Sequence, residues 1–151
     1  MNADDTESED PPSMRFSLRI THFGDDPDAV THILRIKPTQ SGKVGDPYRL
    51  PTGRIIARRG LLLESFWHVL GSTSPHAPAS DHISELTSVT RACNSFNELP
   101  AGTRVIFYGT FIAGDYGPDM QISHSLLIEM ARIGADFEFN RIQIDPRPDP
   151  M

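Results

Sequence analysis

The side chains best suited to chemistry are basic residues concentrated in one short part of an acidic chain. The 151 residues carry a formal net charge of -6 at neutral pH. Half of the 14 Lys and Arg residues nevertheless fall between positions 35 and 59, where Asp46 is the only acid. Guanidinium groups donate hydrogen bonds in a planar fork that matches carboxylates and phosphates. This distribution predicts a surface that receives anions.

The residues expected to bind an anion or a partner are Lys43, Arg54, Arg58, Arg59 and Trp67. A regular strand over residues 54–58 would place Arg54 and Arg58 on one face, because side chains alternate across a strand. The alternatives are a solvated strand face, or a face onto which the acidic N-terminal tail docks. The only tryptophan, Trp67, has apolar neighbours and is expected in the core. A ring edge that lines a shallow pocket beside the Gly45-Asp46 turn is the alternative for it.

Catalytic and metal-binding patterns are missing from the sequence, so we predict no catalytic residue, cofactor or metal. Cys93 lies on an apolar stripe and is interpreted as a core residue. His68, His76 and His82 match no ligand spacing for a metal. The loop at residues 114–119 lacks the Gly-Lys-Ser/Thr ending of a phosphate loop and is interpreted as a turn.

Overall composition excludes several functions and indicates a compartment. A dedicated nucleic-acid binder is normally basic, which makes nucleic acid an unexpected partner here. No apolar run approaches the roughly 20 residues of a membrane span, and the acidic N-terminus does not resemble a signal peptide. A single cysteine fits a reducing compartment. We therefore expect a cytoplasmic protein with no membrane partner; the oligomeric state is left open.

The pattern of apolar residues predicts one α+β domain. Residues 1–13 are expected to be a disordered acidic tail, 14–145 the domain, and 146–151 a proline-rich tail. The elements read strand, helix, strand, strand, helix, strand, helix, strand. We expect a mixed or mostly antiparallel sheet of about five strands with about three helices packed on it. Two stretches that each read strand, acidic loop, helix suggest two βα-type halves.

Several elements carry specific signals. Asp26 and Pro27 are expected to begin the first helix. A strand over 54–58 and another over 62–70 are expected to form the middle pair, and the second of these is expected inside the sheet. The second helix has its apolar stripe at Ile83, Leu86, Val89, Cys93 and Phe96. Gly134 is expected to end the third helix, and a bulge is expected near Asn140 in the final strand.

Four local patterns resemble a bacterial family known only as a domain of unknown function, family 4279. Residues 16–20 resemble its opening strand, and Lys37-Pro38-Thr39 followed by Gly45-Asp46 resembles its loop. Phe66-Trp67-His68-Val69-Leu70 resembles its tryptophan-bearing strand. Helices near His82 and over 126–134 follow in the expected order. The resemblance covers residues 14–144 and implies a small soluble intracellular domain, with no catalytic residues.

Two functional hypotheses remain. The first is a non-catalytic binding module, of which a toxin-neutralising immunity protein is one version, whose basic strand and loop meet an acidic protein or a small anion. The second is a small-molecule sensor or an unrecognised enzyme with a pocket near Trp67. A separate, third hypothesis is that the acidic tail masks the basic patch and regulates it.

Overall fold

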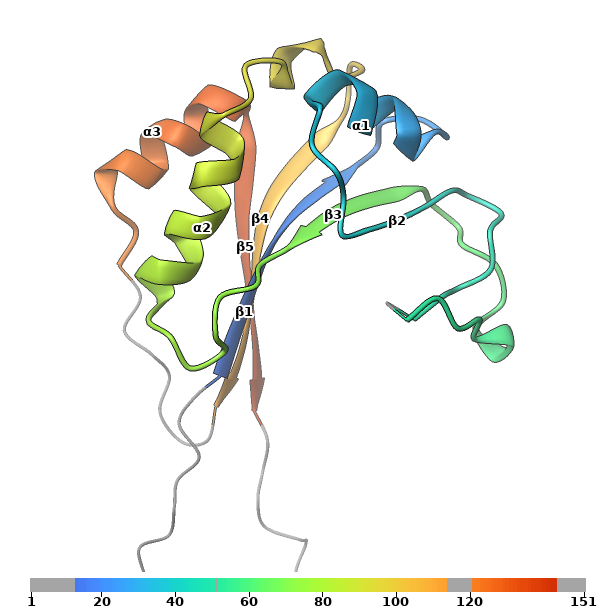
Figure 1. The fold of residues 1–151 in the computed structure, drawn as a ribbon, viewed down its shortest axis with the longest axis horizontal. Coiled ribbons are helices and arrows are strands. Elements are labelled where there is room, and N and C mark those ends of the chain that lie inside the picture. The colour runs from blue at the N-terminus through green and yellow to red at the C-terminus, as the bar shows by residue number, and fades with distance from the viewer. Residues whose placement is uncertain (1–12, 51, 114–120, 144–151) are drawn as a thin grey trace, which may run out of the picture.

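The computed structural model describes residues 13–50, 52–113 and 121–143, and these ranges form one α+β domain. Five strands and three α-helices alternate along the chain in the order expected from the sequence (Figure 1). Their bounds are β1 Ser13–Thr21, α1 Pro27–Leu34, β2 Gln40–Gly42, β3 Phe66–Leu70, α2 Ala79–Arg91, β4 Arg104–Ala113, α3 His124–Ile133 and β5 Ala135–Gln143. Short 3₁₀ turns occur at Ala57–Arg59 (η1) and Phe96–Glu98 (η2).

The strands form one mixed sheet in the order β2-β3-β1-β4-β5. All neighbouring pairs are antiparallel except β4 and β5, which are parallel and are connected through α3. The sequence correctly predicted that β3 and β4 lie inside the sheet. The two predicted βα halves differ. In β4-α3-β5 the two strands are parallel neighbours, whereas β1 and β2 on either side of α1 run in the same direction but are separated by β3, which is antiparallel to both.

One face of the sheet carries the core and the other is open. Met14, Phe16, Leu18 and Ile20 alternate along β1 and are all buried, as period-2 patterning predicts. The helices lie over this face (Figure 1), where α2 contacts β1 and α3 contacts β5. The opposite face presents Ser17, Arg19 and their neighbours on β3 and β4, and no helix of the described residues covers it.

Local signals set the ends of two helices as expected. Asp26 caps α1, since its carboxylate accepts a hydrogen bond from the Asp28 amide (3.0 Å), and Pro27 occupies the first turn. Gly134 ends α3 in the left-handed conformation, at φ 67°. A side chain is disfavoured at that backbone angle, so glycine is the natural choice there.

The structure corrects the prediction of a strand over 54–58. The strand that lies beside β3 at the edge of the sheet is β2, at residues 40–42. Residues 57–59 instead form the 3₁₀ turn η1. Ile55 makes only an isolated bridge to Arg49, and the second expected strand begins at Phe66 rather than Leu62. Gly53 and Gly60 both adopt positive φ angles, which interrupt any longer extended stretch between them.

Two further expectations were wrong. The pairing between β4 and β5 is continuous from Val105–Ala135 to Ala113–Gln143, so there is no bulge near Asn140. The apolar residues of β5 change phase because Phe137 and Phe139 face the helices whereas Ile142 faces the open side. Helix α2 ends at Arg91, so Cys93 and Phe96 lie beyond it, although both are buried as expected.

The two predicted tails and the loop at 114–119 lie outside the described residues. The expected domain limits at 14 and 145 therefore stay predictions, except that Ser13, which was assigned to the tail, is the first residue of β1. Within the described ranges, no helix is both long enough and apolar enough to cross a membrane.

Candidate functional site

The long connection between β2 and β3 folds back on itself and projects from one end of the sheet. We call residues 43–65 the arm; in Figure 1 it extends beyond β2 and β3, away from α2 and α3. Antiparallel bridges join Pro47 to Leu61 and Arg49 to Ile55. Backbone hydrogen bonds from Gly45 to Leu62 and from Leu62 to Asp46 close its base (2.9 and 2.8 Å). The arm is therefore an ordered ribbon held by pairings over long sequence separations.

One buried serine fixes the base of the arm to the body of the domain. The Ser65 hydroxyl accepts a hydrogen bond from the Val44 amide and donates one to the Asp25 carbonyl, both at 2.8 Å. Ser65 is 3% exposed. Because the first bond reaches the arm and the second reaches the loop before α1, this hydroxyl sets the angle at which the arm leaves the sheet.

A hollow of about 880 Å³ lies between the arm and the open face of the sheet. We call it the arginine pocket. Its floor comes from β1, β2 and β3, and its wall comes from the arm. The lining residues that matter here are Arg19, Gln40, Arg49, Arg59, Leu63 and His68.

Arg19 is held rigidly on the floor. Its guanidinium carbon lies 3.6 Å from the ring centroid of Tyr108, and its Nε donates a hydrogen bond to Ser17 Oγ (3.2 Å). A guanidinium on an aromatic face gains cation–π stabilisation and keeps a fixed plane. No hydrogen bond engages its two terminal amino groups within the part of the chain that the structure describes. This side chain can therefore offer them to a ligand without losing much conformational entropy.

Two more arginines approach from the arm. Arg49 donates from one terminal nitrogen to the Gly53 carbonyl (3.1 Å), which ties it to its own loop. Arg59, in η1, makes no side-chain hydrogen bond or ion pair among the described residues. Its charge therefore faces the pocket and solvent without a counter-ion from residues 13–50, 52–113 or 121–143.

His68 contributes a neutral imidazole to the floor. It pairs across the sheet with Arg19, and its ring centroid lies 4.7 Å from that of Phe66. Burial and then the charge of Arg19 lower the pKa of His68 from 6.5 to about 4. At neutral pH this ring is an uncharged hydrogen-bonding group beside a fixed positive charge.

The two acids in the lining are already engaged. Asp46 accepts a hydrogen bond from the Lys43 amide (3.2 Å), within its own turn. Glu64 lies 3.3 Å from His22 Nδ1 at the rim. Three guanidiniums against two carboxylates give the lining a formal charge of +1, and neither carboxylate is paired with one of these arginines among the described residues, which leaves the pocket suited to an incoming anion.

Almost the whole chain matches one known protein family. A family model described as a domain of unknown function (DUF4279) matches residues 12–143. The chain belongs to this family. No curated protein and no solved structure matches it. The resemblance inferred from the sequence is thereby confirmed, and family membership itself names no ligand.

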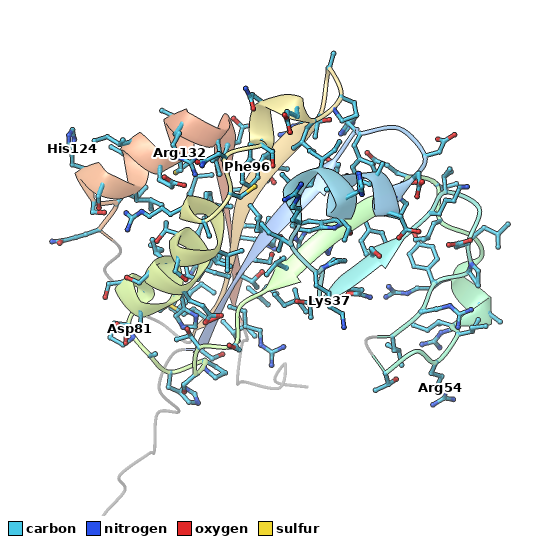
Figure 2. The ribbon with its side chains drawn as sticks, turned by 45° about the horizontal axis from the view of Figure 1, so that its top comes forward. Lys37, Arg54, Asp81, Phe96, His124 and Arg132 are labelled. Atoms are coloured by element: carbon cyan, nitrogen blue, oxygen red, sulfur yellow. The ribbon has the colours of Figure 1, made fainter. Side chains whose placement is uncertain are left out.

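The basic residues singled out from the sequence do not meet in this DUF4279 domain. Arg59 lines the pocket, whereas Lys43, Arg54 and Arg58 lie exposed on the arm outside the lining. Figure 2 shows Arg54 at the outer part of the arm, far from the sheet. Their roles in binding stay predictions, with Arg59 the best placed of the four.

Trp67 lies on the opposite face of β3 from the pocket. It is fully buried in the core of the DUF4279 domain, and its Nε1 donates to Thr31 Oγ1 on α1 (3.0 Å). Of the two alternatives for this residue, the core placement is the one observed. The pocket-facing neighbours of Trp67 in β3 are Phe66 and His68, since side chains alternate across a strand.

The remaining candidates give no reactive site. Cys93 is buried, and its thiol donates to the Leu34 carbonyl (3.4 Å), which fits the core interpretation. His82 is also buried, whereas His76 is exposed and His68 lies in the pocket. Across residues 13–50, 52–113 and 121–143, no three His, Cys, Asp or Glu side chains are placed to hold a metal ion.

Proposed function

We propose that this domain is a non-catalytic binding module whose arginine pocket receives a carboxylate-bearing ligand. The observation that carries the proposal is that Arg19 and Arg59, from distant parts of the chain, line one pocket and have no ion-pair partner within the described ranges. Arg19 is half-buried, and cations withdrawn from water are normally paired, whereas Arg59 is exposed and adds positive charge at the rim. A ligand carboxylate would supply the missing partner.

The geometry favours a planar anion. Arg19 is oriented by Tyr108 and Ser17, so its two free amino groups form a fork of fixed direction. Such a fork matches the two oxygens of a carboxylate. His68 and the Gln40 amide, both in the lining, add neutral hydrogen-bonding groups that would orient the ligand.

The ligand's carboxylate has two sources to consider. An acidic protein is the first, and an immunity-type role against an acidic toxin is one instance of it. A free small dicarboxylate is the second, because about 880 Å³ is within the range of small-molecule sites. The pocket is open to solvent, with Leu63 in its lining 90% exposed, whereas small-molecule sites usually enclose most of their ligand. This openness favours the protein.

Fluorescence anisotropy with a labelled Gly-Glu-Glu-Gly-Glu-Glu peptide tests the proposal. Hydrogen bonds to charged groups contribute about 1.5–3 kcal/mol. Arg59→Gln is therefore expected to weaken binding by about tenfold, which corresponds to about 1.4 kcal/mol. Arg58→Gln removes the same charge from the same 3₁₀ turn outside the lining and serves as the matched control.

The control for Arg19 lies on the same strand. Arg15 is exposed on the same face of β1, about 13 Å along the strand from Arg19. Arg19→Lys keeps the positive charge but loses the planar fork of donors. It should therefore weaken binding of the peptide more than Arg15→Gln does. Equal weakening by the three Arg→Gln variants, with no effect of Arg19→Lys, would show that the peptide senses only overall charge, and the pocket would lose its assignment.

A further inference from the structure

The arm carries a second feature that the arginines do not explain. Five large apolar side chains are exposed along its length: Val44 (39%), Leu50 (40%), Ile55 (48%), Leu61 (59%) and Leu63 (90%). Only six other large apolar residues are as exposed in the whole described part of the chain. Apolar side chains gathered on a projecting segment are typical of protein interaction sites.

These apolar residues alternate with the basic residues of the arm. Arg49 precedes Leu50, Arg54 precedes Ile55, and Arg59 lies two residues before Leu61. Arginine is enriched among the residues that dominate binding energy at protein interfaces, and the buried core of an interface is more apolar than the surrounding surface. Leu50 and Leu63 also line the arginine pocket, so the apolar surface is continuous with the site of charge.

The composition of the arm restricts its occupant. A bare anion would satisfy the arginines but would leave Leu61 and Leu63 in water. The chain's own residues 2–12 carry five acids but no large apolar side chain. They could therefore pair with the arginines but would leave the apolar side chains of the arm uncovered. A ligand that matches both halves needs a carboxylate and an apolar group within a few residues of each other.

We infer that the arm and the arginine pocket together bind a short segment of a protein partner in which acidic residues flank a large apolar side chain. This inference rests on the proposed function, since the acid is the group that the pocket receives. The acidic side chain meets Arg19 and Arg59, and the apolar one packs against Leu63. Charge complementarity selects the partner's acids, and the apolar contact distinguishes the segment from a simple anion.

Two labelled peptides test the inference against full-length protein: Gly-Glu-Gly-Glu-Gly, which is acidic only, and Gly-Glu-Leu-Glu-Gly. The second is expected to bind about tenfold more tightly, because burying one leucine in an apolar contact has an effect of this size. Leu63→Ser should remove that difference between the two peptides. Leu127→Ser, on α3 and 52% exposed, removes a comparable leucine far from the pocket and should change neither peptide.

The outcomes separate this inference from the proposed function. Equal affinities for the two peptides, together with weakening of both by Arg59→Gln, would overturn the inference while the carboxylate pocket stands. No effect of Arg59→Gln on either peptide would overturn the pocket itself.

Two other occupants are also decided by the experiment. Neutralising the acids at positions 4, 5, 7, 9 and 10 to amides tests the chain's own tail. A gain in affinity for both peptides in that variant, with Leu63→Ser having no effect, would make the tail the occupant and overturn the inference. Self-association that Leu63→Ser abolishes would assign the arm to a second copy and overturn it equally.

Discussion

Replacement of Ser65 by alanine tests whether one hydroxyl holds the arm against the domain. The Ser65 hydroxyl joins the Val44 amide to the Asp25 carbonyl through two hydrogen bonds of 2.8 Å. Each such bond contributes about 1 kcal/mol net, and partners left unpaired add to the loss. Ser65→Ala should therefore lower the free energy of unfolding by about 2 kcal/mol, or about 4–8 °C in Tm for a chain of this length.

Urea denaturation measures this loss as a lower midpoint with an unchanged slope. Hydrogen exchange should also accelerate at the Val44 amide, which loses its acceptor. Ser74 is exposed in the β3–α2 loop, and Ser74→Ala provides the control. A Ser65→Ala midpoint equal to that of the control, with Val44 still protected, would refute the assignment of Ser65 as the anchor of the arm.

Three further substitutions have defined outcomes. His68 has a pKa of about 4 in the folded protein and 6.5 when unfolded, so the unfolded chain binds the proton first as the pH falls. The free energy of unfolding should therefore drop by up to about 2 kcal/mol between pH 7 and pH 5. Urea titrations of His68→Gln should show a weaker dependence on pH. Arg132→Met removes the 2.6 Å ion pair to buried Glu129 and should lower the free energy of unfolding by about 2–4 kcal/mol, which a thermal melt detects as a lower Tm. An unchanged Tm would contradict a structural role for the pair. Gly109→Ala places a Cβ 2.8 Å from the Phe16 ring and should lower the free energy of unfolding, measured in urea, by about 1–3 kcal/mol. Wild-type stability would show that the core yields there.

Much of the fold was predictable because its signals are local. The period-2 pattern of residues 16–20 defined β1, and the Asp26-Pro27 cap defined the start of α1. The arm was not predictable in the same way. Its shape depends on bridges such as Pro47 to Leu61, between residues far apart in the sequence, and alternation at 54–58 imitates a strand without any partner strand.

The candidate site was predictable only in its charge. The basic segment pointed to the arm, and Arg59 is the one predicted residue that lines the pocket. Arg19 and His68 were missed because they are 49 positions apart and meet only through the antiparallel register of β1 and β3. The available signal was the polar face of β1, where Ser17, Arg19 and Thr21 alternate with the core residues.

The most direct test of the carboxylate pocket is the pKa of His68, followed by NMR in the full-length protein with and without saturating Gly-Glu-Leu-Glu-Gly. Burial and then the charge of Arg19 lower this pKa in the free protein, and a carboxylate bound beside Arg19 opposes the second of these effects. We predict that the pKa of His68 rises from about 4 when the peptide binds. Saturable binding that leaves the pKa of His68 unchanged would place the ligand elsewhere and contradict the assignment.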